Sequence, residues 1–399
     1  MSEEGKRSSS EIEKNDKIKE RTREEKNRTA YKVVNEVLLK EHAFWSKEPL
    51  GKSQASCKGS GSSSAEGAAG LDIRTVDIAC ELSAVASFLM DHYVEDAEAR
   101  FRLQYSPEFL RWQLESPSVF PEWNIGMFDG SRLVGFISAA AIDIKIKEST
   151  PKTAVVNFLC VHKDYRKRRL APVLIKEITK RVNLKGIYTA LFTSGDKLPY
   201  IFTRSRYYHK ILREGDLVES GFCDQEDIDK ITESRMIFQD SPTVHFRPAQ
   251  ESELPGVYEM YCSKYKDLDI SASFTYEQFK YYVYGDGRGL SRLLVSEDAS
   301  EFVSFFHLST RSVDSKVPIE TAYLSYHTMK HGVGSMLGLI QYLRGTDEFD
   351  VLNALEIESN TQSIFADSGF IKGDGTINYY LFNWDTELIP PSRNSFISY

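Results

Sequence analysis

A cluster of basic residues stands at the junction between a predicted strand and a predicted helix. Five of the seven residues Lys163–Arg169 are Lys or Arg. The preceding segment 154–161, AVVNFLCV, is apolar and rich in β-branched residues, which is typical of a buried strand. From Leu170 to residue 182 apolar residues recur every four positions, with Pro172 in the first turn, where proline is tolerated. The pattern predicts a strand that leads through a basic turn into an amphipathic helix.

This placement gives the basic cluster a chemical meaning. The first N–H groups of a helix have no partners within the helix, and together with Arg side chains they attract anions such as a pyrophosphate. In α/β folds, phosphates bind at such junctions between strand and helix. A solvated basic turn is the alternative, and it is the more common origin of an isolated basic cluster. The flanking strand and helix are what favour an anion site.

Two stretches of the chain share one pattern and suggest that it has two similar halves. Residues 123–144 are two apolar runs joined by Asp129–Gly130, a pair typical of a β-hairpin turn, and residues 291–313 repeat the rhythm. A helical, aromatic-rich stretch precedes each hairpin, PEFLRWQL in one case and TYEQFKYYVY in the other. The repeat is one of pattern and not of identical letters. We expect the halves to cover residues 71–238 and 239–399.

The first 70 residues differ from the rest in composition. Residues 1–30 carry nine Lys or Arg against eight Asp or Glu, and they cannot bury enough apolar surface to fold alone. We interpret them as a disordered, charged tail. A basic arm directed to ribosomes or membranes is the alternative; the acidic residues that cancel its charge disfavour it, and ribosome association stays open. Residues 31–70 form an arm that contains Phe44–Trp45 and ends in a linker rich in Gly, Ser and Ala.

Composition bounds the class of protein. The chain has 399 residues, 41% of them hydrophobic, which is enough for two or three domains or one large one. The net charge of −8 argues against a general nucleic-acid-binding protein. The five cysteines are scattered and never spaced CxxC, which excludes a zinc ribbon and predicts a reducing compartment. Because the chain shows neither a secretory signal nor a long apolar run, we expect a soluble, cytoplasmic protein.

The basic loop resembles the acyl-CoA loop of the GNAT acyltransferase superfamily. It reads Arg166-Lys-Arg-Arg169-Leu-Ala171, with Arg169 at the first glycine of the superfamily pattern. One branch is more similar still: NFLCVHK, RLAPVLIKEIT and KRVNLKGIY look like the signature of eukaryotic N-myristoyltransferases. In family order stand also AFWSKEP, YVEDAEARFRLQYSPEFLRWQL, TSG, RYYH, FVSFF, AYLSYH, NALE and GDGTINYYLFNW. The resemblance covers residues 42–399.

This resemblance implies a fold and an activity. The fold is α/β (α+β): two fused GNAT-like acyltransferase halves related by pseudo-two-fold symmetry, with a saddle-shaped mixed sheet flanked by helices. The implied activity is transfer of myristate from myristoyl-CoA to the N-terminal glycine amine of M-G-x-x-x-[ST] proteins. Myristoyl-CoA would be a co-substrate, with no tightly bound cofactor. A metal, a nucleic-acid substrate or a transmembrane segment is not implied, and a monomer is expected.

The resemblance also implies how the reaction proceeds. In the family the amine attacks the thioester directly, and backbone N–H groups, which fall here at Phe158 and Leu159, hold the oxyanion. The base is the C-terminal carboxylate, which falls here on Tyr399. Fifteen residues follow the pair Asn383–Trp384, which is the usual tail length in the family. An α-carboxyl group is a weak base in water, and burial would raise its pKa.

Two sets of binding residues follow from the same resemblance. The expected acyl-CoA contacts are Phe44, Trp45, Phe158, Leu159, Cys160, Val161, Arg166, Lys167, Arg169, Leu170 and Ala171. The expected peptide contacts are Tyr93, Glu95, Asp96, Glu98, Phe101, Tyr105, Asn157, Thr193, Tyr207, His209, Ser304, Tyr326, Asn353 and Asp374. The carboxylates of the second set suit the Lys or Arg that often follows the Ser of a substrate.

The sequence departs from the family pattern at several places. Ala97 replaces an Asp, Leu103 a Phe and His327 an Asn, and Lys372 is a further local variation. These differences bear on the expected peptide preference and not on the expected reaction. Tyr399 replaces the common terminal Leu or Gln, which changes the side chain and keeps the carboxylate.

Three other functions remain alternatives. Cys160 and His162 are two residues apart on one strand, so they would share a face and could form a thiolate–imidazole acyl carrier. A half-buried cysteine near a surface histidine is the simpler interpretation. The second alternative is a non-catalytic acyl-CoA-binding or interaction protein on the same fold, and the third is a GNAT-type N-acyltransferase for a shorter acyl group.

Overall fold

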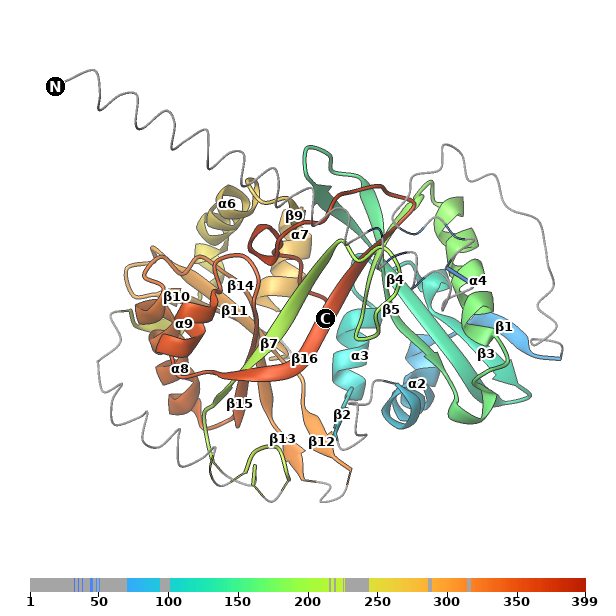
Figure 1. Cartoon of the computed structure of the whole chain (residues 1–399), viewed down its shortest axis with the longest axis horizontal. Coiled ribbons are helices and arrows are strands. Elements are labelled where there is room, and N and C mark those ends of the chain that lie inside the picture. Colours follow the sequence, from blue (N-terminus) through green and yellow to red (C-terminus); the bar gives the residue numbers. More distant parts are fainter. Residues whose placement is uncertain are drawn as a thin grey trace.

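The computed structural model describes residues 70–93, 101–214, 244–285, 289–313 and 317–399, with single residues of the segments 32–50 and 217–226. The predicted tail 1–30 and the expected peptide contacts Glu95, Asp96 and Glu98 lie outside the described residues. The described chain forms one large mixed sheet of thirteen strands with helices packed against it, and a small three-stranded sheet (Figure 1). This arrangement confirms the predicted fold class.

The elements of the described residues are as follows. The strands are β1 (Asp72–Thr75), β2 (Phe101–Leu103), β3 (Ile125–Asp129), β4 (Arg132–Ile146), β5 (Lys152–Val161), β6 (Thr189–Ser194), β7 (Thr203–Ile211), β8 (Phe246–Pro248), β9 (Ile270–Ala272), β10 (Ser291–Ser296), β11 (Phe302–His307), β12 (Thr310–Ser312), β13 (Pro318–Ile319), β14 (Thr321–His327), β15 (Val351–Leu355) and β16 (Ile371–Phe382). The helices are α2 (Ile78–His92), α3 (Pro107–Leu114), α4 (Leu170–Leu184), α6 (Leu254–Tyr265), α7 (Tyr276–Phe279), α8 (Val333–Thr346) and α9 (Gln362–Asp367). A π-turn, Lys280–Tyr284, continues α7.

The predicted strand, basic turn and helix are β5, residues 163–169 and α4. The residues of α4 that recur every four positions are at most 5% exposed, because they face the sheet: Leu170, Leu174, Ile178 and Val182. The two predicted hairpins are β3–β4 and β10–β11, and the two predicted helical stretches are α3 and α7 with its π-turn. The local patterns of the sequence therefore carry over into the structure.

The two halves repeat one supersecondary unit. In the first, antiparallel strands β3, β4 and β5 lead through α4 to β6, which pairs with β5 in parallel. In the second, β10, β11 and β14 lead through α8 to β15, which pairs with β14 in parallel. This repetition agrees with the two similar halves expected from the sequence.

The last strands of the two units are exchanged. The sheet order runs β5-β6-β16-β7-β15-β14, so β7, which follows the first unit, pairs with β15 of the second. In turn β16, which follows the second unit, pairs with β6 of the first and with β7. The exchange joins both units into one continuous sheet, and it brings the chain end after β16 into the centre of the molecule (Figure 1).

A glycine inside α8 permits its close packing on the neighbouring backbone. A Cβ atom added at Gly338 would stand 2.1 Å from the carbonyl oxygen of Val244, whereas one added at Gly345 in the same helix would meet nothing within 4 Å. Overpacking of this kind forces backbone shifts.

We therefore expect Gly338→Ala to lower the free energy of unfolding by about 1–3 kcal/mol, since α8 must move away from Val244. The matched control Gly345→Ala should be neutral or stabilising by at most about 1 kcal/mol, because alanine favours a helix over glycine. Urea denaturation of both variants measures the difference. Equal stability of the two variants would contradict this account of α8.

Candidate active site

The central feature of the site is a β-bulge in β5. The pairing of β4 with β5 shifts between Phe136↔Cys160 and Ser138↔Asn157, so that two residues, Phe158 and Leu159, oppose a single residue of β4. Phe158 has φ of +58°, a left-handed conformation that side chains other than glycine rarely adopt. A bulge disrupts the regular ladder and changes where the backbone N–H groups point.

Strands β5 and β6 separate before the bulge, after Val155 of β5. Their parallel pairing is confined to Thr153–Val155 and Thr189–Leu191, while β5 continues to Val161 and β6 to Ser194. The ladder therefore ends before the bulge begins. The carboxyl-terminal parts of two parallel strands that diverge are a place where α/β folds receive ligands.

The predicted anion site lies at the end of β5. Arg166, Lys167 and Arg169 are all exposed, and no side chain caps the N-terminus of α4. Lys167 and Arg169 adopt φ of +68° and +59°. Glycine adopts such a φ without strain, which explains why the superfamily pattern has its first glycine at the position of Arg169. Arg166 donates a hydrogen bond of 2.8 Å to the carbonyl oxygen of His92 at the end of α2. The loop thus presents basic side chains around free helix N–H groups, as an anion requires.

The chain end meets the bulge from the other side. After β16 the tail runs along the interior: Ser395 donates to Ile270, and Phe396 and Ile397 are at most 4% exposed. The hydroxyl of Ser398 lies 3.4 Å from Oδ1 of Asn157 and 3.3 Å from the hydroxyl of Thr193. Since Asn157 directly precedes the bulge, Tyr399 follows a residue that touches both separating strands. The end of the chain is marked C in the middle of Figure 1.

Comparison with known proteins gives this constellation a family. The models of the N-terminal and C-terminal domains of myristoyl-CoA:protein N-myristoyltransferase match residues 67–205 and 196–395. The chain is 35% identical over 324 residues to a glycylpeptide N-tetradecanoyltransferase of Plasmodium falciparum, covering 78% of each chain. This chain belongs to the N-myristoyltransferase family.

Further relatives agree. A probable glycylpeptide N-tetradecanoyltransferase of Caenorhabditis elegans is 33% identical over 345 residues, covering 82% of this chain and 75% of that one. The crystal structure of Saccharomyces cerevisiae N-myristoyltransferase with bound myristoyl-CoA superposes with a TM-score of 0.78. It is 27% identical and covers 90% of this chain and all of that one. The resemblance read from the motifs is thereby confirmed.

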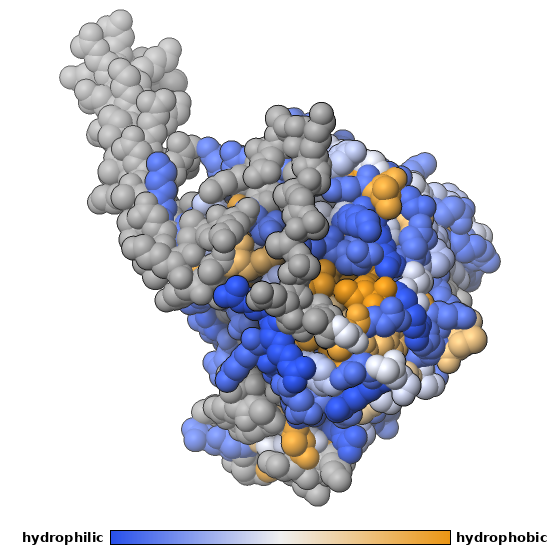
Figure 2. Space-filling view, turned by 90° about the vertical axis from the view of Figure 1, so that its right-hand side faces the viewer, coloured by the Kyte–Doolittle hydropathy of each residue, from blue (hydrophilic) through white to orange (hydrophobic). Residues whose placement is uncertain are grey.

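The expected acyl-CoA contacts outside the basic loop are of two kinds: aromatic rings stacked on β6 and half-buried aliphatic side chains of β5. Trp45 stacks on Phe192 of β6 with ring centroids 5.5 Å apart, and Phe44 packs edge-on against Trp45 at 4.8 Å. Leu159 and Val161 are half-buried on β5 and leave part of their apolar surface open. Figure 2 shows apolar surface surrounded by hydrophilic residues on the face that carries the first half. That Phe44–Trp45 covers bound CoA stays a prediction.

The expected peptide contacts fall into two groups. Tyr93 and Tyr105 lie at the bulge, with ring centroids 5.9 and 5.6 Å from that of Phe158. Burial raises the pKa of Tyr93 to about 12, and a contact with the Phe158 backbone opposes that rise, so the phenol stays protonated at neutral pH. Phe101 lies further off in the small sheet, where β2 pairs with β12.

The second group stands on β7, β15 and the start of β16. Nδ1 of His209 lies 2.5 Å from Oδ1 of Asn353, and burial lowers the pKa of this histidine, so we take the ring as neutral. A Cβ at Gly373 would stand 2.3 Å from Nε2 of His209, so this position must be glycine for the ring to fit. Tyr207 is half-buried and Asp374 is exposed.

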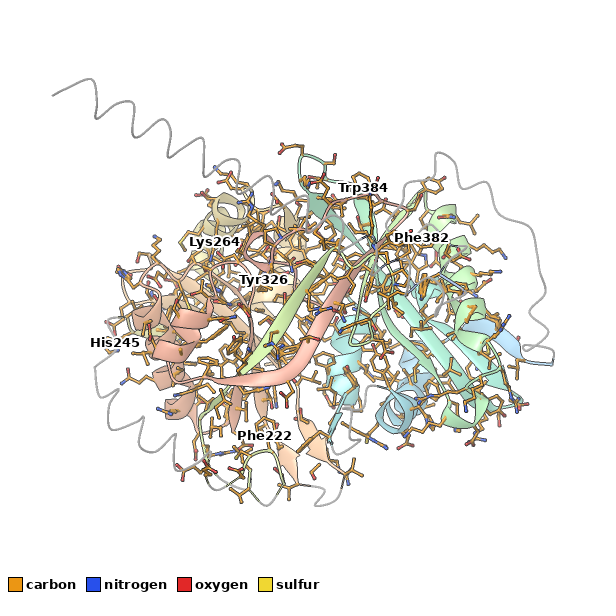
Figure 3. All side chains as sticks on the ribbon, viewed as in Figure 1. Phe222, His245, Lys264, Tyr326, Phe382 and Trp384 are labelled. Atoms are coloured by element: carbon orange, nitrogen blue, oxygen red, sulfur yellow. The ribbon has the colours of Figure 1, made fainter. Side chains whose placement is uncertain are left out.

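Two further expected peptide contacts are buried inside the second half. Ser304 is fully buried, and its hydroxyl bonds to the hydroxyl of Ser325 at 2.7 Å and to the backbone of Tyr326. Tyr326, labelled in Figure 3, is 1% exposed. A direct role of either residue in peptide binding stays a prediction.

The departure at His327 falls into a buried cluster of charges. Lys264 of α6, labelled in Figure 3, forms an ion pair of 2.8 Å with Glu358 and donates to the carbonyl oxygen of His327. Nε2 of His327 lies 3.5 Å from Glu358, and the residue is 2% exposed. Burial and the neighbouring Lys264 lower the pKa of His327 to about 3. The histidine is therefore neutral in the folded protein at pH 7.

This cluster predicts a loss of stability in acid. Because the unfolded chain binds a proton at His327 near pH 6.5 and the folded one only near pH 3, protonation favours unfolding as the pH falls through this interval. An asparagine side chain does not titrate, so His327→Asn should lose less stability than the parent between pH 7.5 and 5. Urea midpoints at both pH values measure this, with His245→Asn, an exposed histidine, as the control. An equal loss in parent and His327→Asn would contradict the buried, neutral histidine.

Cys160 has the properties of a core residue and not of a nucleophile. It is 4% exposed, and burial raises the pKa of its thiol to about 12, so thiolate is scarce at neutral pH. His162 lies beyond the end of β5, and its Nε2 faces Arg132 at 2.6 Å. The covalent carrier considered above finds no support in this geometry.

We expect Cys160→Ala to keep kcat for acyl transfer within about threefold, because the buried, protonated thiol is not suited to act as a nucleophile. Steady-state kinetics together with mass spectrometry for an acylated protein test this. A covalent carrier would lose turnover altogether in this variant and would show an acyl adduct on the parent.

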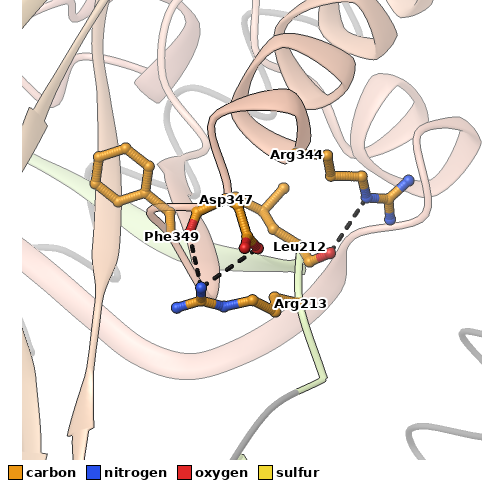
Figure 4. Close-up of a pocket in the computed structure, with 5 residues that line it drawn as sticks. All are labelled: Leu212, Arg213, Arg344, Asp347 and Phe349. Carbon is orange, nitrogen blue, oxygen red and sulfur yellow. Dashed lines mark hydrogen bonds and ion pairs between the residues drawn. The ribbon is translucent and has the colours of Figure 1, made fainter.

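A separate pocket lies in the second half, away from the β5 bulge. A cavity of about 280 Å³ in the second half is lined by Leu212, Arg213, Arg344, Asp347 and Phe349 (Figure 4). Arg213 is paired with Asp350 at 2.8 Å and donates to the carbonyl oxygen of Asp347, and Arg344 donates to that of Leu212. None of the expected site residues lines this pocket. Both arginines that line this pocket are therefore already paired with groups of the protein.

Two further features, a metal-ligating cluster and a membrane-spanning helix, are absent from the described residues. No group of three or more His, Cys, Asp or Glu side chains within them is arranged to hold a metal ion. Among the helices of these residues, none is both long and apolar enough to cross a bilayer.

The sequence did not indicate the surroundings of Tyr399. Its ring contacts Trp112, Tyr282 and Phe306, which come from α3, the π-turn and β11. The only signal was the aromatic character of PEFLRWQL, KYYVY and FVSFF, which is equally typical of core residues.

Proposed function

We propose that this protein transfers myristate from myristoyl-CoA to the N-terminal glycine amine of peptides and proteins. Membership of the family and the printed activity of its relatives support the reaction. The observation that carries the proposal for this chain is the meeting of the β5 bulge with the chain end at Asn157 and Thr193. A backbone anion site and a carboxylate would then stand on either side of one reaction centre.

The first half would hold the acyl-CoA. Arg166, Lys167 and Arg169, with the uncapped N-terminus of α4, suit the phosphates. The thioester would lie where β5 and β6 separate, with its carbonyl oxygen toward the N–H groups of Phe158 and Leu159. Donors fixed by the backbone need not reorganise as the oxyanion forms, and this makes them effective catalysts.

The second half would bind the peptide and supply the base. The α-carboxylate of Tyr399 would take a proton from the glycine ammonium. The free amine then attacks the thioester carbon, a C–N bond forms, and the tetrahedral oxyanion collapses as the C–S bond breaks. The attacking nitrogen loses its extra proton to the departing CoA thiolate, and the carboxyl group of Tyr399 returns its proton to solvent. The buried neighbours Phe396 and Ile397 support this role, because an apolar environment raises the pKa of a carboxyl group toward that of a useful base.

The peptide would lie between the bulge and β7. Tyr93 and Tyr105 stand near the reaction centre, and His209, Asn353 and Asp374 are available further along. We extend the proposal to the division of labour expected from the sequence, in which residues 71–238 bind acyl-CoA and residues 239–399 bind the peptide and supply the base. Tyr93, Tyr105 and His209 of the first range would add contacts to the peptide from the acyl-CoA side.

The terminal base has a direct test. Two glycines added after Tyr399 should leave myristoyl-CoA binding within about twofold and lower kcat for acylation of the peptide GNAAAARR by about 100-fold or more, the contribution expected of a general base. The same two glycines inserted after Gly61, in the segment rich in Gly and Ser, serve as the control. A version of the peptide that begins with alanine should not be acylated by the parent.

The outcomes separate the parts of this proposal. Undiminished transfer by the extended protein would exclude the terminal carboxylate as base. Equal acylation of the glycine and alanine peptides would exclude the requirement for N-terminal glycine. Acylation of a lysine side chain in a lysine-containing peptide, without acylation of an N-terminal glycine, would favour a different acyltransferase.

A further inference from the structure

The side chain of Tyr399 is enclosed by aromatic rings from both halves of the molecule. Its ring lies edge-on to Trp112 and Phe306, each with centroids 5.1 Å away, and is stacked on Tyr282 at 5.7 Å and 14°. Trp112 belongs to α3 of the first half, whereas Tyr282 and Phe306 belong to the second. These three rings are called the aromatic box below.

The walls of the aromatic box are held by their own contacts. Nε1 of Trp112 donates to the carbonyl oxygen of Tyr281, and the hydroxyl of Tyr281 donates back to that of Trp112 at 2.8 Å. The hydroxyl of Tyr282 bonds to that of Ser116 at 2.6 Å. Phe306 is stacked on Tyr323, with centroids 5.1 Å apart. A ring inserted between such walls has little freedom to move.

Polar contacts near the chain end are weaker than this packing. The two hydrogen bonds of Ser398 measure 3.3 and 3.4 Å, and that from the Tyr399 hydroxyl to the carbonyl oxygen of Tyr282 measures 3.4 Å. All three lie beyond the usual range for O–H donors. What fixes the last residue is therefore the ring and not its hydroxyl.

We propose that the side chain of Tyr399 is a positioning group for the reaction: its ring, held in the aromatic box, fixes the α-carboxylate of the same residue beside the β5 bulge. The inference rests on the proposed function, because it assigns a role to the anchor of the proposed base. Ring and carboxylate share one Cα, so an anchored ring leaves the carboxylate only a narrow range of positions. A misplacement of about 1 Å in a catalytic group can cost about 100-fold in rate.

The test compares Tyr399→Ala, Tyr399→Phe and the matched control Tyr188→Ala, a tyrosine that is 52% exposed at the opposite end of β6. Tyr399→Ala keeps a terminal carboxylate and loses its anchor. We expect its kcat for GNAAAARR to fall about 10- to 100-fold, with a myristoyl-CoA affinity close to that of Tyr188→Ala. Its melting temperature should be lower than that of Tyr188→Ala, because three ring contacts are lost. Tyr399→Phe, which retains the ring, should keep kcat within about threefold.

The pH profile provides a readout that a structural role would not move. A released carboxylate is better solvated, which lowers its pKa, so the acidic limb of kcat should shift to lower pH in Tyr399→Ala and not in Tyr399→Phe. An unshifted limb, or a kcat of Tyr399→Ala within threefold of the parent, would overturn the inference. So would an equal loss in Tyr399→Phe, which would assign the effect to the hydroxyl.

A second variant changes a residue of the aromatic box and leaves Tyr399 intact, so it remains informative if Tyr399→Ala does not fold. Phe306→Leu thins one wall and should lower kcat in the parent, but change it little further when combined with Tyr399→Ala, because both act through the same ring. Full additivity of the two effects, or no effect of Phe306→Leu in a folded protein, would overturn the inference. Failure here leaves the terminal base intact if the two-glycine extension still abolishes transfer. Full activity of that extension would instead reject the base itself.

Discussion

The site depends on one extra residue in β5. The bulge at Phe158–Leu159 removes two residues from the regular ladder with β4 and places Phe158 at φ of +58°. It begins three residues after Val155, the last residue of β5 that pairs with β6. A straight strand would present its N–H groups to β4 and leave no place for a ligand between the parallel strands. The basic loop follows the bulge along β5, and the chain end reaches Asn157 directly before it.

The second half has the same irregularity in a closed form. In the pairing of β11 with β14, Ser325 and Tyr326 oppose the single residue Ser304, as Phe158 and Leu159 oppose one residue of β4. Here, however, the hydroxyl of Ser304 bonds to the N–H and the carbonyl oxygen of Tyr326 and fills the gap. At the N-terminus of α8 the buried Glu301 accepts a hydrogen bond from Ser335, where α4 has only exposed basic residues nearby. In the second half, side chains of Ser304 and Glu301 therefore occupy the positions that correspond to the bulge and the basic loop of the first half.

How much of this could be predicted from the sequence differs from feature to feature. The strand β5 and the helix α4 were predictable, because Leu170, Leu174, Ile178 and Val182 mark one face of a helix and AVVNFLCV is apolar except for Asn157. The bulge was not, since in a strand buried on both faces no polar alternation reveals where the register slips. The site residues came from resemblance to a family, and spacing alone would not have brought Asn157, Thr193 and Ser398 together, because contacts over more than 200 residues depend on topology.

That topology is the exchange of β7 and β16. If β16 had paired within its own half, the tail after Phe382 would have begun at the far side of β15, away from β5. Because β16 instead pairs with β6, the tail starts beside the first half and turns back, donating from Ile389 to Phe202 and from Ser395 to Ile270 on its way inward. The last residue then enters an aromatic box to which both halves contribute, so its position is defined only when the halves are docked. The same strand exchange that unites the two halves therefore brings the chain end to β5, as the proposed reaction centre requires.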